Sequence, residues 1–154
     1  MACQPQSKEL APTPLPPTST PAPTHTPPMP PELVQLAAEF QTLRPIFGHF
    51  AGGTWHDDVD QWQGRKHQVM LALATELGSG AYGRSQLTTL LGSADHIVTG
   101  GDSLFKMIQS SPEYEKLNTS EVFLVYEWRG THDFLFFAIT DDHVNGSGWW
   151  YAGE

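Results

Sequence analysis

The chain has 154 residues, a formal charge of −9 at pH 7 and a single cysteine, Cys3. Its eight lysines and arginines are scattered along the chain, so we expect neither nucleic acid nor a membrane as a partner. One cysteine allows no disulfide framework and no multi-cysteine metal site. No stretch has the roughly 20 apolar residues of a membrane span, and the N-terminus lacks the apolar core of a secretory signal. These features predict an intracellular protein, cytoplasmic or nuclear.

Residues 1–31 differ in composition from the rest of the chain. Eleven of the 13 prolines lie between Pro5 and Pro31, among many threonines, serines and alanines. Such a segment buries too little apolar surface to offset its ordering entropy, so we predict a disordered, proline-rich tail. Residues 32–154 are then expected to form a single folded domain, which is large enough to build one core without disulfides.

Apolar residues recur at helical spacing in several segments of this domain. Pro45 is expected to stop the first helix, and Gly78 and Gly92 follow the next two. Ser85 is the expected N-cap of the third helix. The predicted helices span residues 32–43, 65–77, 85–91 and 102–109, and residues 112–120 are expected to form a polar loop.

The last third of the chain has the composition of a β-sheet. Residues 122–154 contain three runs rich in aromatic and β-branched residues, separated by the short polar connections 129–131 and 140–142. Connections this short join antiparallel strands, so we predict a three-stranded antiparallel meander. Helices followed by consecutive strands indicate an α+β domain, with the helices packed on one face of the sheet.

The segment GRSQLTTLLGSAD, residues 83–95, resembles the helix-to-loop signature of the small-protein-A type outer-membrane assembly lipoproteins. Those proteins, and the tandem-repeat β-lactamase inhibitor proteins similar to them, place two helices before a three-stranded antiparallel sheet, so the resemblance implies that fold. Ala94 stands where the signature has proline, no lipobox is present, and residues 102–120 are an insertion before the sheet. The chain is also similar to uncharacterised fungal proteins that end in an HDFLFF…GWWYAGE block, a resemblance that implies no activity.

Both faces of the predicted sheet carry apolar or aromatic side chains. One face is expected to cover the helices, and the other is too apolar to face water uncovered. Either the first helix and the loop at residues 47–50 cover it, or a protein or an apolar small-molecule ligand does. We expect a non-enzymatic binding module that uses an aromatic sheet face, because aromatic side chains supply much of the binding energy at such surfaces. The expected recognition residues are Tyr126, Trp128, His132, Phe134, Trp149 and Tyr151.

A second hypothesis is a small enzyme without an organic cofactor, which acts by proton transfer as an isomerase, cyclase or hydrolase of a specialised metabolite pathway. The segment WHDDVDQWQ, residues 55–63, places two tryptophans around one histidine and three aspartates. His56, Asp57 and Asp58 are its acid–base candidates, and Arg129 is a candidate to steady an anionic intermediate. The alternative is a packed loop whose acids cap the next helix. No phosphate-binding, dinucleotide-binding or histidine-pair metal motif is present, so neither a cofactor nor a metal is expected.

Overall fold

A computed structural model of the chain describes residues 28–117, 119–120 and 122–153. Most of the predicted tail, residues 1–27, therefore lies outside the described residues. At the end of that tail, Met29 packs against the core and Pro31 begins the first helix. The helices are α1 (Pro31–Leu43), the 3₁₀ helix η1 (His49–Ala51), α2 (Asp57–Asp60), α3 (Arg65–Leu77), α4 (Arg84–Leu91), α5 (Ser103–Gln109) and α6 (Tyr114–Leu117), and the strands are β1 (His96–Val98), β2 (Val122–Glu127), β3 (Asp133–Thr140) and β4 (His143–Tyr151).

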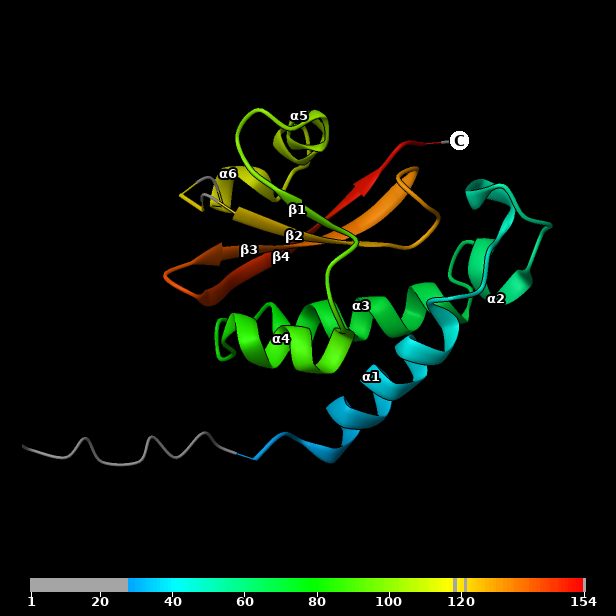
Figure 1. Cartoon of the computed structure of the whole chain (residues 1–154), viewed down its shortest axis with the longest axis horizontal. Coiled ribbons are helices and arrows are strands. Elements are labelled where there is room, and N and C mark those ends of the chain that lie inside the picture. Colours follow the sequence, from blue (N-terminus) through cyan, green and yellow to red (C-terminus); the bar gives the residue numbers. More distant parts are fainter. Residues whose placement is uncertain (1–27, 118, 121, 154) are drawn as a thin grey trace, which may run out of the picture.

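The strands of the described part of the chain form one antiparallel sheet in the order β1-β2-β3-β4 (Figure 1). The α+β class is confirmed, with one strand more than predicted, because the short run of residues 96–98 pairs with β2. The hairpin between β3 and β4 turns through Asp141 and Asp142, whose φ angles are 50° and 63°. Left-handed conformations at both central residues match the twist of the flanking strands, so this two-residue turn sets the pairs next to it. Between Ala138 and Ile139 the register then shifts.

The helix ends follow from the residues at their termini. Pro31 occupies the first turn of α1, where its missing N–H removes no hydrogen bond, and the helix ends two residues before Pro45. The N-terminus of α4 is capped by Gln86, whose Oε1 accepts the backbone N–H of Gly83 at 2.9 Å. The predicted cap by Ser85 is therefore wrong, because the longer amide side chain reaches back to the residue before the helix.

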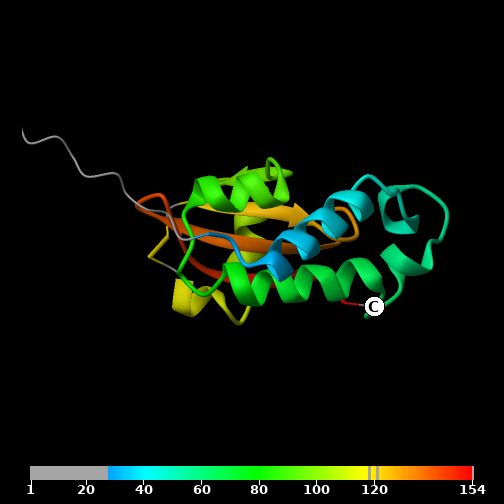
Figure 2. The same ribbon diagram turned by 90° about the horizontal axis from the view of Figure 1, so that it is seen from below.

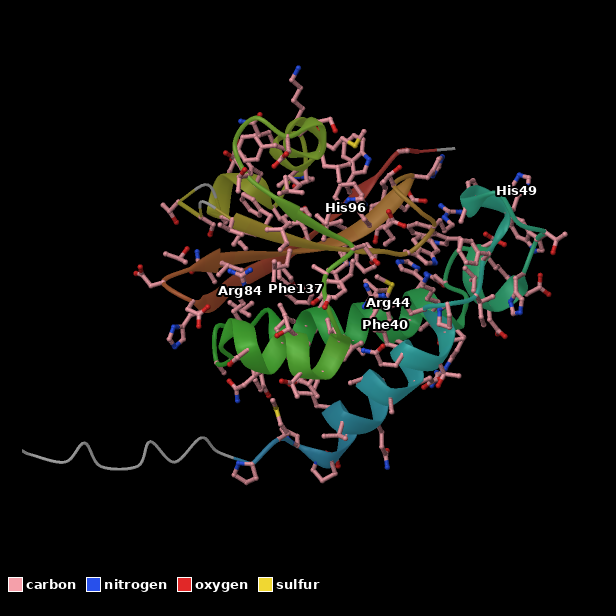
Figure 3. All side chains as sticks on the ribbon, viewed as in Figure 1. Phe40, Arg44, His49, Arg84, His96 and Phe137 are labelled. Carbon is pink, nitrogen blue, oxygen red and sulfur yellow. The ribbon has the colours of Figure 1, made fainter. Side chains whose placement is uncertain are left out.

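The long helices α1, α3 and α4 cover one face of the sheet (Figures 1 and 2). Phe40 of α1 and Phe137 of β3 lie between these helices and the sheet, in one continuous core (Figure 3). We expected helices on this face only, but α5 and α6 cover the opposite face, where Ile108 and Leu117 pack on the strands. The insertion at residues 102–120, which we expected to be partly a polar loop, thus builds a second core.

Candidate functional site

The aromatic residues predicted to form a recognition face are divided between the two cores. Tyr126, Trp128 and Trp149 are buried under the long helices, with Tyr151 packed at the edge of the same core. Phe134 is 0% exposed and lies on the other face, against α5 and α6. The open aromatic sheet face that we expected is therefore not present in the described part of the chain, because each face has its own helical cover.

Several of these residues hold the fold together through polar contacts. The hydroxyl of Tyr126 donates to the carbonyl of Gly92 at 2.9 Å, and burial raises its pKa to about 12. The side chain of His132 is 33% exposed. Its Nδ1 lies 2.9 Å from Oδ2 of the buried Asp133, and its ring packs on Phe50. These contacts assign structural roles to both side chains.

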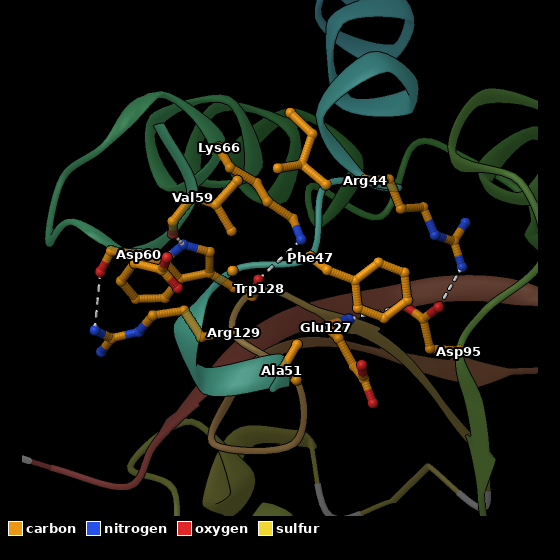
Figure 4. A pocket seen from close by; sticks show the side chains of 13 residues that line it. Arg44, Phe47, Ala51, Val59, Asp60, Lys66, Asp95, Glu127, Trp128 and Arg129 are labelled. Carbon is orange, nitrogen blue, oxygen red and sulfur yellow. Dashed lines mark hydrogen bonds and ion pairs between the residues drawn. The ribbon is translucent and has the colours of Figure 1, made fainter. Parts of the chain in front are cut away.

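A cavity of about 110 Å³ lies at the end of the sheet where β2 leads into the turn before β3 (Figure 4). The residues after β2, the start of α3 and the loop of residues 46–51 meet there. Charged side chains from separate elements line it. Lys66 comes from α3, Asp60 from α2, Glu127 and Arg129 from the end of β2 and the turn that follows, and Arg44 from the end of α1. The fold thus brings five separated segments of the chain to one small space, residues 44–51, 59–60, 66, 95 and 127–130.

Lys66 points into this cavity (Figure 4). The residue is only 4% exposed, and its Nζ donates to the backbone carbonyl of Trp128 at 2.8 Å. An ammonium has three N–H donors, and Lys66 forms no other hydrogen bond and no ion pair with the described residues. Two donors are therefore left to meet whatever occupies the cavity.

Burial changes the protonation of this amine. Desolvation lowers the pKa of Lys66 to about 8, although the negative charges of Asp95, Glu127 and Asp60 oppose the shift and Arg44 adds to it. With this pKa, about one amine in ten is neutral at pH 7. An amine that is partly neutral at this pH can act as a base or a nucleophile, which a solvated lysine does far less well.

The two arginines of the cavity are already engaged. Arg44 forms an ion pair with Asp95 at 2.6 Å and also donates to the carbonyls of Leu91 and Ser93. Arg129 is buried, pairs with Asp133 at 2.6 Å and donates to the backbone carbonyl of Asp60. These guanidinium groups therefore brace the walls of the cavity.

Asp60 fastens the loop that covers the cavity. It is fully buried, and its Oδ2 accepts the backbone N–H groups of His49 and His56 at 2.9 and 2.7 Å. Its Oδ1 is also buried and has no hydrogen-bond partner among the described residues. A Cβ atom on Gly48 would lie 2.2 Å from this oxygen, so only glycine lets the loop approach so closely.

Glu127 lies at the rim of the cavity, and its side chain turns toward the surface. Its Oε1 lies 2.8 Å from Nε2 of His96, the first residue of β1. The side chains of His96 and Glu127 are 39% and 31% exposed, so both are in contact with solvent. Along β2 the side chain of Glu127 follows Val125 on the sheet face that α5 and α6 cover, whereas Lys66 lies on the opposite face.

The predicted acid–base residues lie elsewhere. Asp57 and Asp58 are exposed, and Asp57 accepts a hydrogen bond from the indole of Trp55. Neither they nor His56 line the Lys66 cavity, and the residue of this segment that does is Asp60. The acids form the short helix α2 itself, and the cap of α3 makes no side-chain hydrogen bond, so the expected capping role is also wrong.

Sequence reasoning also missed Lys66, although the sequence carries a signal for it. The buried stripe of α3 contains Val69, Met70, Leu73 and Leu77, and Lys66 extends this stripe by one turn. A charged residue at a core position of an amphipathic helix is unusual, because an unpaired charge is costly to bury.

Within the described ranges, no helix is long and apolar enough to cross a bilayer, and no three His, Cys, Asp or Glu side chains gather as metal ligands would. Comparisons with protein-family models, with curated proteins and with solved structures found no match for this chain. The resemblances seen in the sequence thus stay predictions, and the function is inferred from the geometry of the Lys66 cavity.

Proposed function

We propose that the chain is a small enzyme that works without an organic cofactor and moves a proton on a small molecule bound in the Lys66 cavity. The observation that carries the proposal concerns two residues that line the same cavity. Among the residues that the structure describes, Lys66 leaves two N–H donors without an acceptor and Asp60 one carboxylate oxygen without a donor. Incompletely paired charges in a protein interior reduce stability, and they gather where binding or catalysis needs them.

The amine of Lys66 is the reacting group in this proposal. A base works best when its pKa lies near the working pH, and burial brings the pKa of Lys66 to about 8. Phe47 at the cavity is 74% exposed, so solvent at this rim can take up a proton or return it. This is the cofactor-independent enzyme of the sequence analysis, with Lys66 in place of His56, Asp57 and Asp58.

Ligand binding at an aromatic edge is the second candidate. Trp62 is 52% exposed and lies 5.3 Å from Tyr151 between ring centroids, beside a pocket of about 290 Å³. Of the predicted recognition residues, Tyr151 is the one that lines this pocket. A flat apolar ligand would stack there, and Trp62→Ala would abolish its binding without changing chemistry in the Lys66 cavity.

Proton exchange tests the enzymatic proposal directly. The full chain is incubated in deuterated water with hydroxyacetone or glycolaldehyde, and proton NMR follows the loss of the hydrogens next to the carbonyl. We expect exchange faster than in buffer, a rate that rises as the pH passes about 8, and loss of that exchange in Lys66→Met. The control, Lys106→Met, changes an exposed lysine and should keep the native rate. Exchange no faster than in buffer, or a Lys66→Met variant as active as the native chain, would overturn the proposal.

A further inference from the structure

We infer that the substrate of the Lys66 cavity is a small, uncharged aldehyde or ketone, and that Lys66 holds it as an imine. The inference rests on the proposed function, because it specifies what the amine reacts with. Three features of the cavity carry it: its size, the pairing of its charges, and the position of Lys66.

The size of the cavity limits the part of the substrate that enters. An apolar cavity of about 150 Å³ in another protein holds benzene, so a cavity of 110 Å³ accepts about four non-hydrogen atoms. Phe47 lines the cavity and is nevertheless 74% exposed, which places its ring at the rim. A longer substrate would therefore leave its remainder beside Phe47, outside the cavity.

The charges of the cavity select an uncharged group. The guanidinium groups of Arg44 and Arg129 already pair with carboxylates, while Asp60 and Glu127 add negative charge to the walls. A substrate carboxylate or phosphate would find Lys66 as its main counter-ion and would repel the acids. A hydroxyl next to the carbonyl fits better, because it adds no charge and can both donate and accept hydrogen bonds at these polar walls.

Imine formation uses the neutral amine that burial provides. The Nζ of Lys66 adds to the carbonyl carbon, and the carbonyl oxygen takes up the proton that the nitrogen loses. A second proton, supplied by solvent water, allows that oxygen to leave as water. The product is a protonated C=N bond, which draws electrons from the neighbouring carbon. The proton on that carbon then passes to water at the rim of the cavity. Its return at a different carbon and the addition of water release the isomerised carbonyl compound and restore the amine.

Reductive trapping tests the inference on the full chain. Glycolaldehyde and sodium cyanoborohydride are added at pH 7, the hydride reduces any imine to a stable hydroxyethyl amine, and peptide mass mapping compares the lysines. At this pH the neutral fraction of Lys66 exceeds that of an ordinary lysine by about 300-fold, so labelling at least about tenfold faster than at Lys106 and Lys116 is expected. The same reagents applied to the chain unfolded in urea should label all lysines equally.

The outcomes separate this inference from the proposed function. Labelling of Lys66 no faster than that of the exposed lysines would overturn the imine, and if proton exchange still depended on Lys66, the amine would be a base only. Trapping without proton exchange would support the imine and overturn proton transfer. The Lys66→Arg variant, which keeps the charge but forms no imine, should lose both the label and the exchange.

Discussion

Replacing Lys66 with methionine should stabilise the protein at neutral pH while it abolishes the proposed activity. Methionine keeps an unbranched stem of similar length but removes the buried charge. Active sites commonly reduce stability in this way, since groups placed for chemistry are poorly solvated in the folded state. The direction of the change is unusual, because most substitutions of a buried residue destabilise.

The magnitude follows from the pKa of Lys66. Folding lowers the pKa of Lys66 from 10.5 to about 8. A protonated amine at this position therefore reduces the free energy of unfolding by about 3 kcal/mol. Loss of the hydrogen bond to the Trp128 carbonyl subtracts about 1 kcal/mol, so Lys66→Met should gain about 2 kcal/mol at pH 7. Between pH 8 and pH 10.5 the unfolded chain binds more protons at this position, so the native chain gains stability as the pH rises. By pH 10.5 the variant should be the less stable protein by about 1 kcal/mol.

Urea denaturation at pH 7 and at pH 10.5 measures this difference. The quantity compared is the free energy of unfolding of the variant minus that of the native chain. In this difference the contributions of all other titrating groups, including the buried tyrosines, cancel. Lys106→Met is the matched control, and its difference from the native chain should be the same at both pH values. A Lys66→Met variant that is less stable than the native chain at pH 7, or whose difference is independent of pH, would refute the reasoning.

Three other substitutions, measured by urea denaturation, test the wall of the cavity, the buried ion pair and the cover of the second sheet face. Gly48→Ala forces a Cβ to within 2.2 Å of Asp60 Oδ1 and should cost about 1–3 kcal/mol, whereas Gly100→Ala, with nothing within 4 Å, should leave the midpoint unchanged. Asp133→Asn leaves a buried guanidinium without its carboxylate and should cost about 3–5 kcal/mol; native stability would argue against that ion pair. Phe134→Ala should cost about 3–5 kcal/mol, and a loss below about 1 kcal/mol would instead place Phe134 on an open face.

Local patterns in the sequence were sufficient for much of the fold. The helix predicted over residues 65–77 matches α3, because its apolar stripe and the glycine after it are signals contained within the helix. Apolar side chains on both faces of the last strands were also predicted, since successive residues of a strand point to opposite faces. These features depend on neighbours only a few residues apart.

Features that depend on distant segments were missed. Strand β1 is three residues long and is stabilised by pairing with residues 123–125, about 27 positions further along the chain. The cover of the second sheet face comes from α5 and α6, which are too short to show a clear helical period. Without that cover, the aromatic side chains around Phe134 were read as a surface.

The candidate site was located only in part. The segment 55–63, which held the acid–base candidates, contributes Asp60 to the cavity. Its spacing does not show which aspartate turns inward, and the one-turn helix α2 buries Asp60 while it exposes Asp57 and Asp58. The cavity itself depends on the tertiary packing of five segments, Lys66 among them, which no local pattern predicts.

Titration of the Lys66 amine is the most direct test of this account. The chain has four lysines, so carbon-13 labelling of their side chains gives few NMR signals. The signal that is absent from the Lys66→Arg variant is that of Lys66. The account predicts that the signal of Lys66 titrates with a midpoint near pH 8, and that a bound carbonyl compound shifts it. A midpoint near the ordinary value of 10.5 would show a solvated ammonium and would contradict the proposed chemistry of the cavity.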